Sequence, residues 1–211
     1  SAVRAWGFLM QRVDYRIAVS ELARAAAMRY LPGEYEIIPN GITMPAEAQP
    51  GGRRNNVVFI GRNDPRKGLE TLLRTWPNVH ARTGARLRLI GADPRSVRLT
   101  MSRRRLSEEG VDLLGVVTGE PLTGELKDAK ALVAPSLGAE SFGMVLVRAF
   151  GCATPVVASD IPGYAQVMTP EVHQLRIFGE RAVDDIAHRR GNEDLASMAG
   201  CRDPCRPVHD G

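Results

Sequence analysis

Residues 131–150 have the sequence ALVAPSLGAESFGMVLVRAF. The first four residues are all apolar, which is typical of a strand buried on both faces of a parallel sheet. A loop containing glycine and serine follows, and a helix is then predicted to begin near Ser141 and to run to Cys152. A strand that passes through a short loop into a helix is the repeating unit of α/β domains, so this stretch indicates the fold class.

The same unit recurs on both sides of this stretch. Short, mostly apolar runs predict strands at 16–19, 36–38, 56–60, 86–90, 111–114, 131–134 and 155–158. Helical patterns between them predict helices at 21–30, 68–83, 94–109, 122–130 and 141–152. This alternation predicts an α/β fold with a doubly wound, Rossmann-like parallel sheet. A ligand is expected at the carboxyl ends of the strands, near helix N-termini.

Composition divides the chain into three parts. The stretch 44–55, MPAEAQPGGRRN, is rich in Pro, Gly and polar residues and is interpreted as a domain boundary. Residues 1–43 precede it, and residues 55–168 form the predicted main domain. Beyond Met168 the regular pattern stops, so 169–211 is expected to be a weakly structured tail, with 183–187 as its one helix candidate.

Charge and cysteine content exclude several classes of protein. The chain has 28 Lys plus Arg and 24 Asp plus Glu, a net charge of +4. This suits an anionic ligand, but no basic stripe interleaved with aromatics indicates nucleic acid. The arginines at 103–105 precede two glutamates and are interpreted as a solvated helix face. Three cysteines (Cys152, Cys201 and Cys205) favour a reducing compartment over a disulfide framework, and we expect a cytoplasmic protein.

A first motif, GRNDPRKG at 61–68, follows the strand predicted at 56–60. Gly61 allows a tight turn, and Arg62 and Lys67 place two cations at the carboxyl end of the strand. Such a pair suits a diphosphate, which arginine binds as a planar fork and lysine as a point charge. A charged surface loop without a ligand would have the same residues, so this motif alone leaves both interpretations open.

The second motif is the loop and helix start within 135–150. Unpaired N–H groups at a helix N-terminus favour an anion, and Gly143 would permit its close approach. The Glu140 carboxylate, just before the helix, is a good acceptor for sugar hydroxyls. It is equally suited to capping the helix as an acid, and spacing alone does not separate these roles. A third segment, 153–163, is interpreted as a structural strand and turn that closes the ligand crevice.

These segments, together with IAVSE at 17–21 and IPNG at 38–41, resemble glycosyltransferase family 4 (group 1), retaining enzymes of the GT-B fold. The similarity runs from about Arg16 to Met168, and it is greatest to enzymes of the phosphatidylinositol mannosyltransferase type. The resemblance implies that the chain is the C-terminal, nucleotide-sugar-binding half of such an enzyme. Residues 1–43 would then be a remnant of the acceptor domain and its linking strand.

The resemblance also implies roles for particular residues. Arg62 and Lys67 would bind the donor diphosphate, and Glu140 would hold hydroxyls of the transferred sugar, making these the expected catalytic residues. Sugar transfer would proceed by front-face attack, with the leaving diphosphate stabilised by the two cations and the helix N-terminus. No cofactor and no metal are expected, since Asp-x-Asp is absent from the predicted donor domain. The other expected donor-binding residues are Gly61, Val117 beside the nucleobase, Ser141, Phe142, Gly143, Met144, Val145 and Arg148.

Three departures from the family limit this expectation. Arg148 stands where the family has a carboxylate for the nucleotide ribose, and a guanidinium cannot accept hydrogen bonds from hydroxyls. Most of the acceptor domain lies outside the 211 residues, and the sequence of 169–211 diverges. We therefore expect weakened nucleotide binding and no activity from the isolated chain.

Two functions remain open. The first is glycosyl transfer from a nucleotide-diphospho-sugar, GDP-mannose or a UDP-sugar, to a lipid or saccharide acceptor, with an acceptor domain or partner chain supplying the other half. That half would also provide any peripheral association with the inner face of the membrane. The second is a catalytically inactive nucleotide-binding or interaction module. A dinucleotide-dependent dehydrogenase is disfavoured, because no Gly-x-Gly-x-x-Gly follows a predicted strand.

Overall fold

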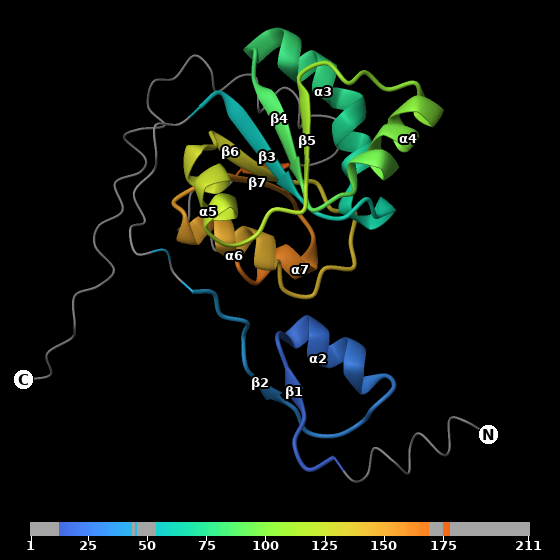
Figure 1. Ribbon diagram of the computed structural model, residues 1–211. Helices are drawn as coiled ribbons and strands as arrows, with labels where there is room; N and C mark the ends of the chain where they lie inside the picture. Colours follow the sequence, from blue (N-terminus) through green and yellow to red (C-terminus); the bar gives the residue numbers. More distant parts are fainter. Residues whose placement is uncertain (1–12, 44, 46–53, 169–174, 178–211) are drawn as a thin grey trace, which may run out of the picture.

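The computed structural model describes residues 13–43, 45, 54–168 and 175–177 (Figure 1). Cys201, Cys205 and the helix candidate at 183–187 lie outside this range, as does most of 169–211. The described chain forms an α/β domain from residue 54 onward and a smaller strand–helix–strand piece at 13–43. None of the helices in these residues is long and apolar enough to cross a membrane.

The α/β domain is built on a six-stranded, entirely parallel sheet with the order β5-β4-β3-β6-β7-β8. The chain therefore winds outward in one direction from β3, returns to β6 beside it, and winds outward in the other direction. The reversal between β3 and β6 is a topological switch point, where α/β sheets open a crevice for ligands. The strands are β3 (Asn56–Ile60), β4 (Arg86–Ile90), β5 (Val111–Gly115), β6 (Ala131–Ala134), β7 (Val156–Ser159) and β8 (Leu175–Ile177).

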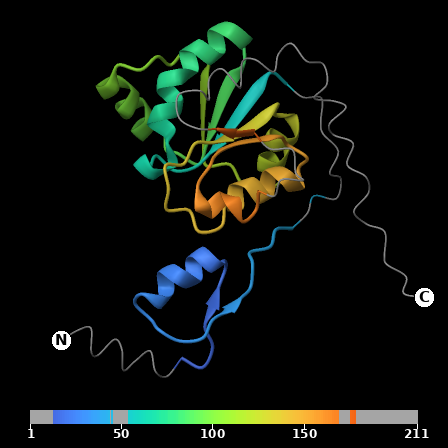
Figure 2. The ribbon, with the colours of Figure 1, turned by 180° about the vertical axis from the view of Figure 1, so that it is seen from behind.

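Helices cover both faces of the sheet (Figures 1 and 2). One face packs against α3 (Leu69–Thr83) and α4 (Pro94–Arg104), and the other against α5 (Gly119–Asp128), α6 (Met144–Gly151) and α7 (Pro162–Ala165). Successive strand residues point to opposite faces, so β3 places Val57 in one buried cluster and Val58 in the other. A doubly wound parallel sheet is thus confirmed.

The core on the α3 side is anchored by Trp76. Its side chain is fully buried, and its indole Nε1 donates a hydrogen bond of 3.0 Å to the Gly110 carbonyl oxygen. This bond satisfies the one polar atom of the ring, so the large apolar surface is buried without an unpaired donor. It also joins α3 to the start of β5, and thereby positions the outer strands against the helix.

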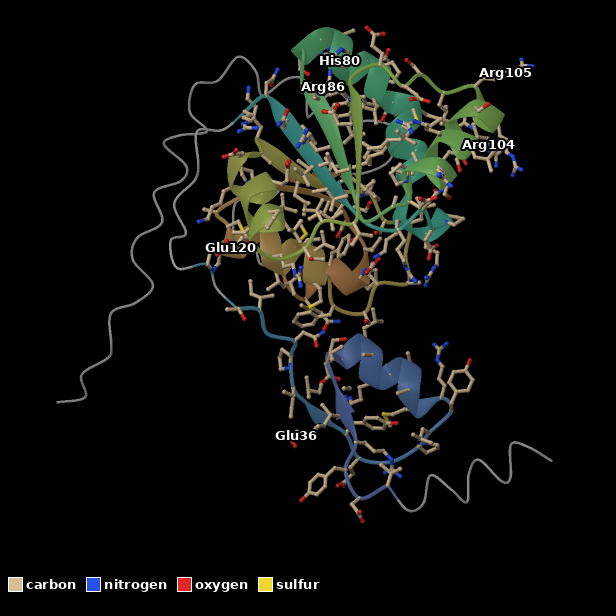
Figure 3. All side chains as sticks on the ribbon, in the orientation of Figure 1. Glu36, His80, Arg86, Arg104, Arg105 and Glu120 are labelled. Carbon is tan, nitrogen blue, oxygen red and sulfur yellow. The ribbon has the colours of Figure 1, made fainter. Side chains whose placement is uncertain are left out.

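Several element boundaries differ from the sequence prediction. Helix α4 ends at Arg104 instead of residue 109, because Arg105 adopts a left-handed conformation (φ 53°) and its N–H caps the last turn. Arg104 and Arg105 point outward from this helix end, as expected of a solvated face (Figure 3). Helix α6 begins at Met144 instead of Ser141, since Gly143 is left-handed. Helix α5 begins at Gly119, and α7 and β8 were not predicted at all.

The N-terminal piece has little interior of its own. Strands β1 (Ile17–Ala18) and β2 (Glu36–Ile37) pair in parallel, and α2 (Glu21–Met28) connects them. Ser20 caps α2, because its Oγ accepts a hydrogen bond from the Ala23 N–H. None of the eight residues of α2 is buried. Figure 2 shows the piece beside the end of the α/β domain that carries α6 and α7.

Candidate functional site

Two loops leave the sheet at the switch point, one after β3 and one after β6. They are joined by a backbone hydrogen bond of 2.8 Å from the Leu137 N–H to the Arg66 carbonyl oxygen. Gly68 makes this approach possible: it is left-handed (φ 68°), and a Cβ there would lie 1.9 Å from the Pro135 carbonyl oxygen. The two motifs identified in the sequence are therefore held together by main-chain contacts.

Lys67 and Glu140 meet across these loops. The Lys67 Nζ forms an ion pair with Oε1 of Glu140, and both side chains are largely shielded from solvent, with 23% and 16% exposure. Glu140 Oε2 makes no hydrogen bond with the described residues. The structure thus brings a cation and a carboxylate together, with one carboxylate oxygen left to accept a further hydrogen bond.

Ser136 and Tyr164 lie behind Glu140. The Ser136 Oγ is 2.7 Å from the Tyr164 hydroxyl and 3.4 Å from Glu140 Oε1. Burial raises the pKa of Tyr164 to about 12, against the opposing effect of the Ser136 hydrogen bond, so the phenol stays protonated at neutral pH. Three polar groups, two from the loop after β6 and one from α7, consequently form one connected network.

The N-terminus of α6 faces the same space. Its cap, Gly143, has no side chain to pair with the N–H groups of the first turn. The Leu146 N–H donates to the Gly143 carbonyl oxygen, whereas the N–H groups of Met144 and Val145 have no acceptor among the described residues. Left-handed backbone at Gly143 (φ 86°) places it against the Tyr164 ring, where a Cβ would lie 2.9 Å from Cδ1. These exposed dipoles make the helix start suitable for an anion.

A hollow of about 140 Å³ lies where these features converge. Small-molecule sites commonly measure about 300–1,000 Å³, so this hollow holds only part of a nucleotide sugar, and the remainder lies over the surrounding surface. Among the described residues no cluster of three His, Cys, Asp or Glu side chains could hold a metal ion. The hollow is lined by Asn40, Lys67, Glu140, Ser141, Phe142, Gly143, Met144, Val145 and Tyr164.

Four of the residues expected to bind the donor do not line this hollow. Arg62 is exposed on the β3 loop, and Gly61 begins that loop. Val117 follows β5 and packs partly into the core on the α5 side. Arg148 is exposed in the last turn of α6. These four residues therefore lie outside the lining of the hollow.

The other basic residue of the β3 loop is engaged locally. The Arg66 guanidinium pairs with Asp64 at 2.7 Å, and this hydrogen bonding lowers the pKa of the Asp64 carboxyl to about 2. Arg66 is thereby committed to shaping its own loop. Of the other two cations, Lys67 pairs with Glu140 and Arg62 makes no ion pair with the described residues.

Sequence reasoning missed three residues of the site. Asn40 reaches the hollow from the IPNG segment, which had been noted only as a motif. Ser136 lies in the second motif but carried no assigned role. Tyr164 follows the segment interpreted as purely structural, and Gly163 beside it packs so tightly that a Cβ would lie 1.7 Å from the Glu140 carbonyl oxygen. The proline-glycine turn before Tyr164 was the available signal, because such turns permit close backbone approach.

The family model for glycosyl transferases group 1 matches residues 54–190. This is more than half of the chain, and it covers every strand of the six-stranded sheet. The chain belongs to this glycosyltransferase family. The match extends past Met168, so it includes β8 and part of 169–211, which was expected to be a divergent, weakly structured tail.

Two relatives of this glycosyltransferase chain carry the same name. The phosphatidyl-myo-inositol mannosyltransferase of Mycobacterium leprae is 35% identical over 182 residues, which are 82% of this chain and 48% of that protein. The protein of the same name from Mycobacterium tuberculosis H37Rv is 34% identical over 165 residues, 75% of this chain and 43% of that protein. The glycosyltransferase chain thus spans about half the length of these relatives.

Solved structures share the fold of this glycosyltransferase chain. Sucrose-phosphate synthase from Thermosynechococcus elongatus superposes with a TM-score of 0.67 at 26% identity, over 93% of this chain and 53% of that chain. HepE of Anabaena, in complex with UDP and glucose, superposes with a TM-score of 0.69 at 21% identity, over 93% of this chain and 59% of that chain. The doubly wound domain therefore has the fold of GT-B glycosyltransferases, as the sequence predicted.

Proposed function

We propose that this chain supplies the donor-binding half of a retaining glycosyltransferase. The enzyme would transfer the sugar of a nucleotide-diphospho-sugar to a lipid or saccharide acceptor. The observation that carries the proposal is the pairing of Lys67 with Glu140 beside the N-terminus of α6, at the switch point of the sheet. A cation, a carboxylate and unpaired helix N–H groups are the groups that a sugar diphosphate needs.

Each group would act on a different part of the donor. The Lys67 ammonium and the N–H groups of the α6 start would neutralise the diphosphate, whose charge grows as the glycosidic bond breaks. Arg62, exposed on the same loop, would reach the outer phosphate oxygens. Glu140 Oε2 would accept a hydrogen bond from a sugar hydroxyl. Retention would follow from front-face attack, with no cofactor and no bound metal.

The donor and the acceptor are proposed from the relatives. Two of these are phosphatidyl-myo-inositol mannosyltransferases, which favours GDP-mannose, while the HepE structure with UDP and glucose makes a UDP-sugar the next candidate. A lipid acceptor would require an acceptor domain or partner chain, and would bring a cytoplasmic enzyme to the membrane surface. The isolated chain would then bind the donor without completing transfer.

Calorimetric titration of the chain with GDP, UDP, ADP, GDP-mannose and UDP-glucose tests this proposal. We expect saturable binding that prefers one base, and a loss of about ten-fold or more when Lys67 or Arg62 is replaced by Ala, since a charged hydrogen bond contributes about 1.5–3 kcal/mol. Arg103→Ala is the matched control, because Arg103 is an exposed arginine on α4, against the opposite face of the sheet. Absence of binding to all five ligands would refute the proposal.

A second candidate function rests on Arg148. Its exposed guanidinium stands eight residues after Glu140 and cannot accept hydrogen bonds from a ribose, which favours an inactive nucleotide-binding or interaction module. Arg148→Glu should raise nucleotide affinity about ten-fold if ribose contacts are otherwise intact. Unchanged affinity would show that Arg148 does not weaken the site.

A further inference from the structure

The hydroxyl groups of Ser136 and Tyr164 are buried side by side. Their residues are 2% and 3% exposed, and the two oxygens are 2.7 Å apart. A buried hydroxyl that lacks a partner costs free energy, so such groups persist where a network satisfies them. This network leads to Glu140, whose Oε1 is 3.4 Å from the Ser136 Oγ.

The network has one consistent direction. Serine carries a single proton, and the ionised carboxylate of Glu140 is an acceptor only, so Ser136 donates to Glu140. The Tyr164 hydroxyl must then donate to the Ser136 Oγ. The bond from the Ser136 Oγ to Glu140 Oε1 is long, at 3.4 Å. It therefore orients the Glu140 carboxylate more than it contributes binding free energy.

Glu140 needs such orientation once a donor arrives. In the ligand-free chain, Oε1 is held mainly by Lys67. A diphosphate would draw the lysine away, and the carboxylate would lose its strongest partner at the moment when it has to accept a sugar hydroxyl. Ser136 contacts the same oxygen and is itself 2% exposed, so it would remain in place when Lys67 moves.

The backbone of Glu140 is already fixed by other contacts. Gly163 packs against its carbonyl so closely that no side chain fits between them, and the Ser141 carbonyl accepts a 2.6 Å hydrogen bond from the Ser20 hydroxyl. Only the side-chain torsions of Glu140 remain to be set, and the described groups that touch its carboxylate are Lys67 and Ser136.

We propose that Ser136 and Tyr164 are positioning residues, which hold Glu140 Oε1 from behind so that Oε2 is presented to the donor sugar while Lys67 binds the diphosphate. This rests on the proposed function, because it assigns Glu140 to the sugar. It concerns the sugar part of the ligand alone and leaves nucleotide binding to other residues.

The experiment compares a nucleotide sugar with the bare nucleotide diphosphate. Affinities of the chain for GDP-mannose and GDP, or for UDP-glucose and UDP if the chain prefers uridine, are measured by calorimetry for the wild type, Tyr164→Phe, Ser136→Ala and the double variant. Each single variant should lose about five-fold in affinity for the nucleotide sugar, the effect of one hydrogen bond. Affinity for the diphosphate should stay within about two-fold. The double variant should be no weaker than the weaker single variant, since both changes break the same chain of bonds.

Distinct outcomes overturn distinct claims. Equal losses for both ligands, or additive losses in the double variant, would make the two residues merely structural. If the variants kept the wild-type ratio of affinities for the nucleotide sugar and the diphosphate, with no loss for either ligand, Ser136 and Tyr164 would have no positioning role. The proposed function would be unaffected by that result. A wild-type chain that binds neither ligand would refute the proposed function and this inference together. Ser136→Ala keeps the Tyr164 ring in place, so it decides the matter if Tyr164→Phe fails to fold by circular dichroism.

Discussion

The α/β domain at 54–168 and the N-terminal piece at 13–43 differ in how they are stabilised. The domain has a buried cluster on each face of its sheet. The piece has two strands of two residues each and a helix with no buried residue. Seven of the ten large exposed apolar side chains of the described residues belong to the piece: Val13, Tyr15, Ile17, Leu22, Met28, Tyr30 and Ile38.

The difference shows that a region can carry sequence motifs of the site without having a stable hydrophobic core of its own. The piece carries two of the recognisable motifs and contributes Asn40 to the hollow, although it has almost no core. The Ser20 side chain links it to the domain through the Ser141 carbonyl. One side of the site is therefore formed by the N-terminal piece, which is less stable than the α/β domain that it faces.

The largest contrast is expected from removing one aromatic ring in each region. Trp76→Ala should destabilise the domain by about 3–5 kcal/mol, because it leaves a large cavity and removes one of the two hydrogen bonds that the Gly110 carbonyl accepts. Tyr30→Ala should change the free energy of unfolding by less than about 0.5 kcal/mol, since Tyr30 is 83% exposed. Urea unfolding measures both, and similar costs would invalidate the comparison.

Alkaline pH should act on the domain through Tyr164. Its pKa is raised from an ordinary value of about 10 to about 12 in the folded chain. The folded state is therefore stabilised by the protonated phenol below about pH 10, and this contribution to the free energy of unfolding is lost as pH rises to about 12. Two pKa units correspond to about 2 to 3 kcal/mol. Urea unfolding at a series of pH values should show a steeper decline for the wild type than for Tyr164→Phe. If the free energy of unfolding fell equally with pH in both proteins, the raised pKa of Tyr164 would be contradicted.

Two glycine substitutions sharpen the comparison at the level of the backbone. Gly163→Ala should cost about 1–3 kcal/mol and weaken donor binding, because the new Cβ collides with backbone atoms of Glu140 that cannot move aside. Gly41→Ala is the matched control within the N-terminal piece, where a Cβ meets nothing within 4 Å. Thermal unfolding and calorimetry should separate the two variants, and equal effects would be inconsistent with the packing described.

The smallest effect is expected at the link between the regions. Ser20→Ala removes the cap of α2 and its contact with the Ser141 carbonyl, at a cost of about 1 kcal/mol to the piece. Hydrogen exchange should then accelerate in α2 but not in β3. Arg24→Gln, which removes only an exposed ion pair with Glu21, should change exchange in α2 by less. Unchanged exchange after Ser20→Ala would mean that the link does not stabilise the piece.

Much of the fold could be predicted from local pattern. Three strands, β3, β4 and β6, have the bounds that the sequence predicted, because each is a short, largely apolar run flanked by polar or turn residues. Helix ends were harder to predict, since they depend on single backbone conformations. Arg105 ends α4 in a left-handed conformation that its neighbours in sequence do not indicate.

The candidate site divides in the same way. The sequence indicated Lys67 and Glu140 as a cation and a carboxylate on neighbouring loops, and the structure brings them together across 73 positions of the chain. The contacts of Ser136 with Tyr164 and of Ser20 with Ser141 span 28 and 121 positions. Such pairs arise from tertiary packing, which spacing along the chain does not encode.

Gly68 and Gly163 offer a way to sort other sequences. Each marks a close backbone contact of the Glu140 loop. A side chain at position 68 would force the Lys67 loop away from it, and a side chain at position 163 would force α7 away from it. A related chain can preserve every charged residue of the site and still be unable to assemble it. Glycine at both positions is therefore a stricter criterion for an intact hollow than the presence of the lysine and the glutamate.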